Sequence, residues 1–439
     1  MGKIHLAQYV ILAIGFASYT HKTHSVSKIE LCGRRFGLTW RRIRLLKIGI
    51  FTDLFHPRII GGGENRLLHL ASALAEKGHH IHVITSVVPG HPKKEKLAEG
   101  IIIHRIGIPH PKDGTSIVAS ILYLIHGIAS LRRFAALKLD VVESNTYLPA
   151  FLASLFSAIT KTPHIMTIHD VYLTDWKYRV GLLLAPFAAL IERGLRRLQY
   201  SKLVTVSESS KKKLTSMIGF DESGIEVIPN GVSFKEIDST PPAREHHSVA
   251  FLGRLVPHKH VDHLIQAFCI LKKASNESTL IIVGVGPERD NLEQFVEQLG
   301  VEESVTFAGF IKERDDVYSL LKNVDCLVNP STVEGFGIAL LEAMAAGAVP
   351  IVYDLPAYSD FVENGNNAIV VEPGDIRGLA DSMIQVIGDE SLKERLSQNG
   401  LQTAKSFSWS QIGKSVLELY RDAIKERFQV SIPDSMMKS

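Results

Sequence analysis

Two acidic residues, Glu334 and Glu342, bracket a glycine-rich turn in the second half of the chain. Residues 329–347 predict a strand end, a loop that contains Gly335 and Gly337, and an alanine-rich helix from about residue 338. The free N–H groups at such a helix start suit a phosphate, and carboxylates accept hydrogen bonds from sugar hydroxyls. If the segment were only a glycine-rich start of an ordinary helix, the acidic residue at position 334 would have no explanation. We therefore interpret the segment as a site for a ligand that carries both phosphate and hydroxyl groups.

Two cations precede this segment. Arg254 and Lys259 follow a predicted strand at residues 249–252 and lead into a helix that starts near Val261. Two fixed cations beside a helix N-terminus can neutralise a diphosphate without a metal ion. A solvent-exposed pair of charges explains the stretch equally well when it is taken alone. The neighbouring pair of acids favours the diphosphate.

Two further motifs follow strands in the first half. A triple glycine at residues 61–63 leads into an amphipathic helix, but Arg66 stands where a dinucleotide fingerprint needs its third glycine. His169 follows a strand predicted at residues 164–168, at the sheet edge where ligands of α/β proteins bind. The alternatives to ligand binding are a plain turn for the glycines and a hydrogen bond to the backbone for the histidine.

The histidines give weak support for a metal site. His258, His260 and His263 have loosely ligand-like spacing, but we find no carboxylate or cysteine cluster that supports them. The chain contains no Asp-x-Asp motif, and Asp315-Asp316 is expected to lie at a helix start and to cap it. We therefore expect no metal ligands and no cofactor.

Length and composition limit the classes of protein. A chain of 439 residues predicts about two or three domains. A net charge of +3 does not favour a nucleic-acid partner. Three widely spaced cysteines exclude a disulfide framework and suit a reducing compartment, so we expect a cytoplasmic protein.

Short apolar runs alternate with helix-length segments, which is typical of parallel α/β units. Strands are expected at residues 47–52, 80–85, 101–106, 139–143, 164–168, 202–206, 225–228, 249–252, 279–283, 304–308, 325–329, 349–353 and 368–371. A polar stretch at residues 235–247 reads as a linker. The predicted organisation is an N-terminal extension (1–46), two Rossmann-like domains (47–238 and 239–408), a last helix (409–428) and a tail (429–439). The extension could be a membrane anchor, a targeting piece or a misassigned start.

The order and spacing of these motifs resemble the retaining GT-B-fold glycosyltransferases of family 4, also called glycosyl transferases group 1. The resemblance extends from about residue 47 to about residue 427. It implies an α/β fold of two Rossmann-like parallel-sheet domains that face each other across a cleft, with a C-terminal helix that crosses back to the first. It also implies metal-independent transfer of a hexose from a UDP- or GDP-linked sugar to an acceptor hydroxyl, with retention of configuration. A nucleotide-sugar epimerase of the same fold is the alternative, and a non-catalytic nucleotide-sugar binding protein is a third reading.

The resemblance also implies roles for single residues. Catalysis would depend on His169, Arg254, Lys259 and Glu334. The donor-binding residues would be Gly62, Gly63, Arg254, Lys259, Ile311, Glu334, Gly335, Phe336, Gly337 and Glu342. Within this set, Glu334 would bind the sugar hydroxyls, Glu342 the ribose, and the backbone near Ile311 the base.

Two features bear on the acceptor and the donor sugar. Apolar segments at residues 117–128 and 182–191, the second followed by Arg193, Arg196 and Arg197, suit either a core helix or a surface that rests on anionic lipid. We therefore expect a glycan or lipid-linked acceptor and peripheral contact with the cytoplasmic membrane face. His260 stands where the family usually has glycine, and residues 353–360 depart from the family pattern, so the sequence does not specify the sugar.

Overall fold

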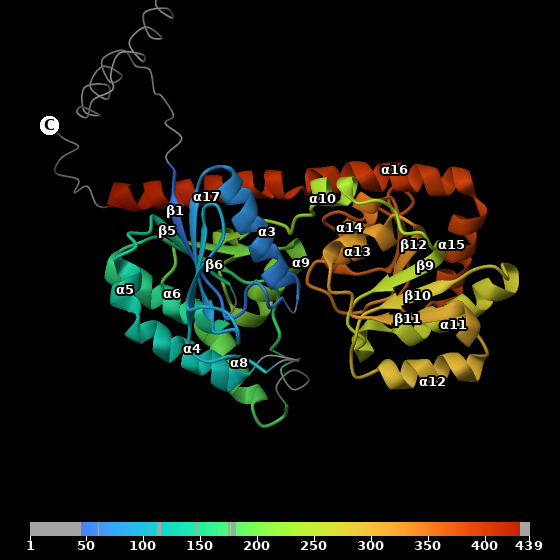
Figure 1. The fold of residues 1–439 in the computed structure, drawn as a ribbon, viewed down its shortest axis with the longest axis horizontal. Coiled ribbons are helices and arrows are strands. Elements are labelled where there is room, and N and C mark those ends of the chain that lie inside the picture. Colours follow the sequence, from blue (N-terminus) through green and yellow to red (C-terminus); the bar gives the residue numbers. More distant parts are fainter. Residues whose placement is uncertain are drawn as a thin grey trace, which may run out of the picture. The chain divides into compact units, whose positions relative to one another are not determined.

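The computed structural model describes residues 45–430, without residues 60, 112–115, 146, 174–175 and 177–180 and without the side chains of residues 428–430 (Figure 1). One compact unit begins at Leu46. The expectations for residues 1–44 and for the tail from residue 431 lie outside the described residues. No helix in the described part of the chain is long and apolar enough to cross a membrane.

The first sheet has eight strands in the order β3-β4-β2-β1-β5-β6-β7-β8. Their bounds are β1 (Lys47–Phe51), β2 (His80–Ser86), β3 (Lys94–Ala98), β4 (Ile101–Ile106), β5 (Val141–Asn145), β6 (His164–Thr167), β7 (Lys202–Thr205) and β8 (Ile225–Val227). Every pair is parallel except β3 and β4. The central strands read as continuous apolar runs because helices cover both faces of a parallel sheet.

The second sheet has six strands, all parallel, in the order β11-β10-β9-β12-β13-β14. Their bounds are β9 (His247–Leu252), β10 (Leu280–Val283), β11 (Val305–Gly309), β12 (Val324–Asn329), β13 (Val349–Tyr353) and β14 (Ile369–Val371). All strands expected from the sequence are present, with ends displaced by at most two residues. The antiparallel edge strand β3 was not predicted.

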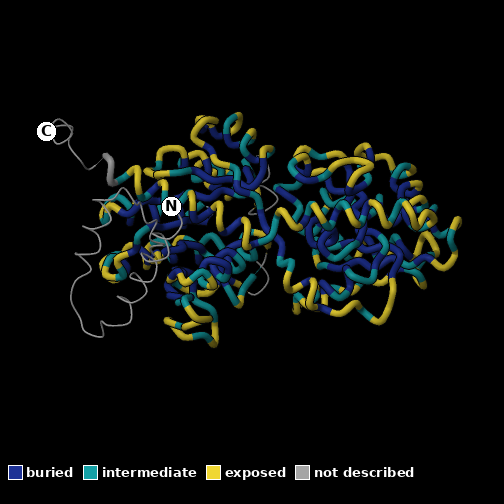
Figure 2. The backbone as a smooth tube through the Cα atoms, turned by 90° about the horizontal axis from the view of Figure 1, so that it is seen from above, coloured by how far each residue is buried: buried dark blue, intermediate teal, exposed yellow. Residues whose placement is uncertain are grey.

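Helices connect the strands and cover the sheets, whose own strands are largely buried (Figure 2). In the first half they are α3 (Gly62–Glu76), α4 (Ile117–Ala129), α5 (Leu131–Ala135), α6 (Tyr147–Thr160), α8 (Ala185–Gly194), α9 (Glu208–Lys213) and α10 (Phe234–Ser239). In the second half they are α11 (Val261–Ala274), α12 (Arg289–Leu299), α13 (Arg314–Leu321), α14 (Ile338–Ala346), α15 (Ile376–Gly388), α16 (Glu390–Ser406) and α17 (Trp409–Val430). Helix α10 occupies the start of the segment that was expected to be a linker.

The last helix, α17, returns to the first sheet (Figure 1). It packs against α3, and its apolar face, which includes Trp409, Val416 and Tyr420, shares one buried cluster with residues of β1, β2 and α3. The hydroxyl of Tyr420 donates a hydrogen bond to the buried carboxylate of Glu143 on β5. The crossing of the C-terminal helix back to the first part of the chain is therefore confirmed.

Candidate active site

Lys259 and Glu334 form an ion pair, although 75 positions separate them in the sequence. Lys259 ends a 3₁₀ turn, Pro257–Lys259, and Glu334 lies in the loop between β12 and α14. Their side chains are only 12% and 17% exposed, and the amide of Asn329 lies 3.4 Å from the same carboxylate oxygen. The structure thus brings into contact a cation and a carboxylate that the sequence analysis expected to bind the same ligand.

Arg254 is an exposed residue on a loop whose backbone is closely packed. On either side of it, the N–H of Gly253 donates to the carbonyl of Val283 and that of Leu255 to the carbonyl of Val285, both at 3.0 Å. A Cβ at Gly284 would lie 1.8 Å from the carbonyl oxygen of Gly253. The Gly-x-Gly pattern at residues 284–286 is therefore a packing requirement that positions the Arg254 loop, not a dinucleotide fingerprint.

Gly284→Ala should both destabilise the protein and lower its activity. The new methyl group meets backbone atoms that cannot rotate away, and Gly284 has a φ of +145°, which side chains disfavour. We expect a loss of at least about 1–3 kcal/mol in the free energy of unfolding, measured by urea denaturation. Gly388→Ala is the matched control, because its Cβ would have no neighbour within 4 Å. Equal stability of the two variants would contradict this account of the loop.

The glycine turn before α14 presses against other parts of the chain. Gly337 has a φ of +91°, and a Cβ there would lie 2.8 Å from the ring of Tyr358. Phe336 is buried and packs against Phe361, with ring centroids 5.1 Å apart and the rings tilted by 38°. A Cβ at Gly335 would approach the carbonyl oxygen of His169 to 3.3 Å. The turn is held rigidly, with its backbone at the start of a helix where an anion can bind.

His169 lies two residues beyond the end of β6 and touches the glycine loop of the first half. Its Nε2 hydrogen-bonds the side-chain oxygen of Asn145, and a Cβ at Gly63 would lie 3.4 Å from that nitrogen. A Cβ at Gly62 would lie 3.0 Å from Ile338 at the start of α14. Burial, with a smaller contribution from the charge of Arg66, lowers the pKa of His169 to about 3. The imidazole is therefore neutral near pH 7 and can donate or accept a hydrogen bond without carrying charge.

Two serines that the sequence analysis did not single out join these segments. The hydroxyl of Ser207 donates to the carbonyl of Gly335 at 2.9 Å, and that of Ser210 donates to the carbonyl of His169 at 3.1 Å. Ser207 also caps α9, since it accepts from the N–H of Ser210. Nothing in the sequence indicated that the Ser207 hydroxyl reaches the glycine turn, 128 positions away. The two serines bring His169 and the Glu334 loop to one place.

Glu342 lies on the buried face of α14 and is paired with Arg314. The Arg314 guanidinium also lies over the ring of Tyr318, 5.0 Å from its centroid. Ile311, expected near the base, is half-buried in the same loop region, three residues before Arg314. Arg314 was missed because an arginine at a helix start reads as a solvated residue until its acidic partner is known. Asp315 and Asp316 lie in the first turn of α13, but the expectation that they cap the helix is wrong, because Glu313 is the N-cap residue and its side chain makes no capping hydrogen bond.

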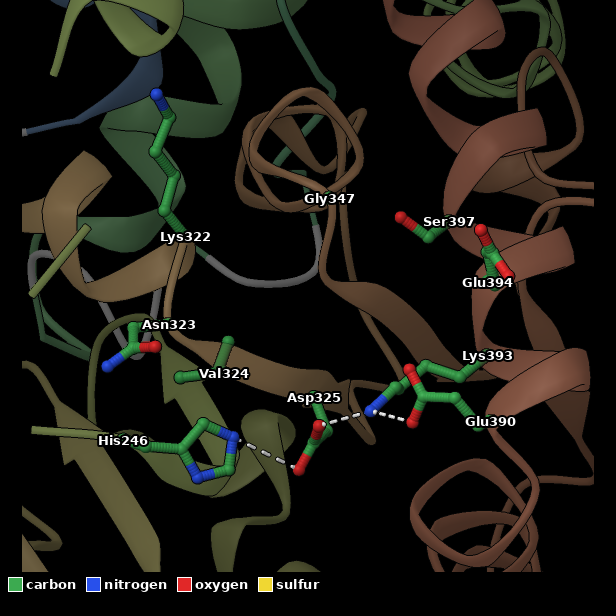
Figure 3. A pocket seen from close by; sticks show the side chains of 10 residues that line it. All are labelled: His246, Lys322, Asn323, Val324, Asp325, Gly347, Glu390, Lys393, Glu394 and Ser397. Carbon is green, nitrogen blue, oxygen red and sulfur yellow. Dashed lines mark hydrogen bonds and ion pairs between the residues drawn. The ribbon is translucent and has the colours of Figure 1, made fainter. Parts of the chain in front are cut away.

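A polar pocket of about 340 Å³ lies at the other end of the second sheet (Figure 3). Asp325, near the amino end of β12, lines it, whereas the candidate site follows the carboxyl end of that strand. Three of its charged side chains are joined in ion pairs: Lys393 pairs with Asp325 at 2.9 Å and with Glu390 at 2.8 Å, and His246 lies 3.3 Å from Asp325. We therefore interpret the pocket as a structural ion-pair cluster.

Comparisons with known proteins agree with this geometry. The family model Glycosyltransferase Family 4 matches residues 60–236, and the model Glycosyl transferases group 1 matches residues 233–403. An uncharacterized glycosyltransferase of Methanocaldococcus jannaschii is 28% identical over 399 residues, covering 87% of this chain and 99% of the relative. Alpha-monoglucosyldiacylglycerol synthase of Acholeplasma laidlawii is 26% identical over 402 residues, covering 86% and 98%.

Among solved structures, HepE of Anabaena in complex with UDP-glucose superimposes with a TM-score of 0.66 at 19% identity, covering 86% of this chain and all of that one. This likeness shows the fold: two α/β sheets in the GT-B arrangement. The two family models together span the segments that carry Gly62, His169, Lys259 and Glu334. The chain belongs to the family 4 (group 1) glycosyltransferases, which are retaining enzymes of GT-B fold that use nucleotide-sugar donors.

Proposed function

We propose that this enzyme transfers a hexose from a UDP- or GDP-linked sugar to an acceptor hydroxyl with retention of anomeric configuration and without a metal ion. The observation that carries the proposal is the Lys259–Glu334 pair, held beside the turn of Gly335 and Gly337. A half-buried carboxylate and a cation at a helix N-terminus match the two halves of a sugar diphosphate. Residues 47–238 would bind the acceptor and residues 239–408 the donor.

Donor binding would separate the paired charges. Lys259 and Arg254 would hold the diphosphate, while Glu334 would turn to the sugar hydroxyls and the amides of Phe336 and Gly337 would lie between them. In the same way, Glu342 would exchange Arg314 for the ribose hydroxyls. Each carboxylate is already desolvated and partnered, so the exchange of one charged partner for a hydrogen-bonding one costs little reorganisation.

The reaction would follow from this placement. As the bond to the diphosphate breaks, Lys259 and Arg254 stabilise the negative charge that develops on the leaving group. The acceptor hydroxyl attacks the anomeric carbon on the face that the diphosphate leaves, which retains the configuration, and its proton passes to a departing phosphate oxygen. His169, neutral because burial lowers its pKa, would contact the transferred sugar without adding charge.

A panel of UDP- and GDP-sugars, assayed for diphosphate release with and without acceptors and in the presence of a chelator, tests this function. We expect release from one donor, dependent on an acceptor and unaffected by the chelator. The binding of UDP-glucose by HepE supports UDP-glucose as the first donor to try. Free sugar or an epimer formed without acceptor would favour the epimerase alternative, and no release from any donor would refute the proposal.

We also propose that the acceptor is lipid-linked and that the first half of the chain docks on the cytoplasmic membrane face. Neighbouring helices α4, α6 and α8, together with the turn at residues 182–184 just before α8, expose large apolar side chains to solvent. These are Val118, Ile121, Ile125, Ile128, Leu155, Ile159, Leu182, Leu183, Leu184, Phe187 and Leu190. Exposed arginines follow at Arg193, Arg196 and Arg197. The one acidic residue on these three helices, Glu192, is buried under hydrogen bonds from Tyr147 and Trp176.

On α4, α6 and α8 the structure thus describes an apolar surface flanked by cations and without exposed acids, which fits an anionic bilayer. The core-helix alternative does not hold for these side chains, since Val118 on α4 is 62% exposed and Phe187 on α8 is 66% exposed. The likeness to a synthase whose name specifies a glucosylated diacylglycerol adds support for a lipid acceptor.

Neutralising Arg193 and Arg197 together should weaken vesicle binding about 30-fold, because each basic residue near an anionic surface contributes about 1 kcal/mol. The measurement is co-flotation with vesicles containing phosphatidylglycerol. Arg196 is left in place because it hydrogen-bonds the carbonyl of Ile218. The control is Arg377→Gln with Arg395→Gln on α15 and α16. Equal losses in the two double variants would contradict a docking surface on α8.

A further inference from the structure

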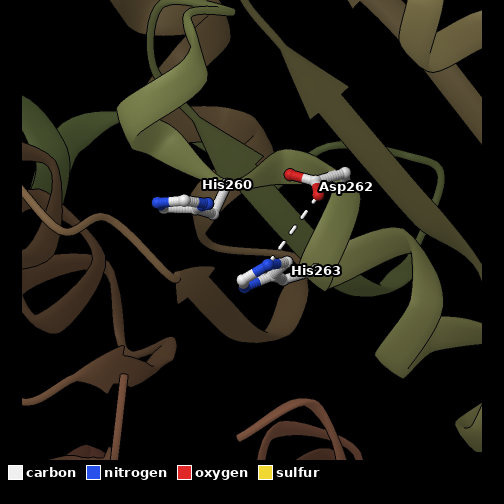
Figure 4. A group of neighbouring side chains, drawn as sticks. All are labelled: His260, Asp262 and His263. Carbon is white, nitrogen blue, oxygen red and sulfur yellow. Dashed lines mark ion pairs between the residues drawn. The ribbon is translucent and has the colours of Figure 1, made fainter. Parts of the chain in front are cut away.

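Three side chains at the start of α11 form a cluster of metal-ligand type: His260, Asp262 and His263 (Figure 4). One potential ligand atom from each lies within 4.8 Å of the others. The imidazole rings are stacked with centroids 4.6 Å apart, and Nε2 of His263 lies 3.8 Å from a carboxylate oxygen of Asp262. The sequence analysis found no carboxylate to support these histidines. Asp262 is that carboxylate, and the helix brings it to the histidines.

Each histidine is already oriented through one ring nitrogen. Nε2 of His260 hydrogen-bonds the hydroxyl of Thr332 at 3.1 Å, and Nδ1 of His263 hydrogen-bonds the hydroxyl of Tyr353 at 2.9 Å. Metal-binding histidines usually use one nitrogen in this way, because the hydrogen bond fixes the tautomer and the direction of the other nitrogen. These two hydrogen bonds leave Nδ1 of His260 and Nε2 of His263 as the other ring nitrogens, and Nε2 of His263 lies 3.8 Å from the Asp262 carboxylate.

The backbone supports the same conclusion. His260 has a φ of +46°, a left-handed conformation that a non-glycine residue adopts at a cost. A glycine would adopt this conformation without the steric cost that the histidine side chain bears. The N–H of Thr332 also donates to the carbonyl of His258 at 2.9 Å, which fixes the two loops to each other.

We propose that His260, Asp262 and His263 bind a divalent transition-metal ion, with Zn²⁺ as the best match and water completing the coordination. Two imidazoles and one carboxylate suit Zn²⁺ and Co²⁺, whereas Mg²⁺ and Ca²⁺ prefer oxygen ligands throughout. The site lies beside Lys259 but shares no ligand with the donor residues. It is therefore separate from the proposed donor site, and the transfer proposed above does not use it.

The test uses the full chain without a polyhistidine tag, titrated with Co²⁺ and followed by its visible ligand-field absorption, then displaced by Zn²⁺. We expect one ion per chain, and loss of that binding in His260→Ala and in His263→Ala. His246→Ala is the matched control, because His246 also lies beside an aspartate in the same half of the chain but belongs to no group of three ligand-type side chains among the described residues.

Two conservative changes separate a built site from adventitious surface binding. Tyr353→Phe and Thr332→Val each remove only the hydroxyl that orients a histidine, and we expect each to weaken Co²⁺ binding about 10–100-fold. Wild-type affinity in both variants, or equal loss of affinity in His246→Ala, would overturn the proposal. The absorption readout is independent of glycosyl transfer, so an inactive donor site would not affect the result.

Discussion

Replacement of Lys259 by alanine should lower turnover about 10²–10³-fold while the protein remains folded. In the proposed reaction, Lys259 and Arg254 stabilise charge that develops on the leaving diphosphate, and removing one such donor affects the transition state more than the ground state. Steady-state kinetics on the identified donor measure the loss, and it should appear in kcat more than in KM. Arg254→Ala should act in the same direction.

The controls separate chemistry from folding. Lys259→Ala also leaves Glu334 without its partner, so thermal unfolding is measured on this variant and on Lys259→Ala combined with Glu334→Gln. Lys425→Ala is the matched control, because Lys425 also pairs with a carboxylate, that of Asp422, but lies on α17. Wild-type activity in both Lys259→Ala and Arg254→Ala would refute the assignment of these residues to the diphosphate.

Replacement of Arg66 by methionine should cost about 3–5 kcal/mol of folding free energy, because it leaves a buried carboxylate without its cation. Arg66 on α3 is fully buried and donates to the carbonyl of Pro229 at 2.6 Å and to the side chain of Asn230 at 3.2 Å. Its charge acts on the buried Glu143, which also accepts hydrogen bonds from Tyr420 and Thr167. The network links α3, β5 and α17, so its loss should loosen the returning helix.

A double-mutant cycle shows whether the charges depend on each other. Urea unfolding is measured for Arg66→Met, for Glu143→Leu and for both changes together. We expect the double variant to be clearly more stable than the sum of the single losses predicts, because neither charge is then left unpaired. Arg377→Met, at a side chain that is 71% exposed, is the control and should change stability by no more than about 0.5 kcal/mol. Strict additivity would contradict an electrostatic network.

The order of strands and helices could be predicted from the sequence because a parallel sheet covered on both faces needs continuous apolar runs. In a chain that alternates apolar runs with helix-length segments, runs such as Ile48–Phe51 and Leu280–Val283 predict buried strands. Strand β3 escaped detection because the segment Lys94–Ala98 is mostly charged and pairs only along one edge. Helix α10 escaped because its six residues are too short for a helical period to be visible.

The placement of Lys259 and Glu334 on loops after strands also follows from the sequence, since the carboxyl ends of parallel strands meet at one edge where ligands bind. The ion pair between Lys259 and Glu334 cannot be predicted from the sequence. The same is true of the contacts Glu342–Arg314 and Gly335–Ser207. Such contacts join residues from 28 to 128 positions apart, and they depend on which helices and loops the folded chain brings together. The local sequence pattern determines where strands and helices form and which residue types stand at their ends. The tertiary fold decides which charges are buried together, because burial depends on all the surrounding elements at once.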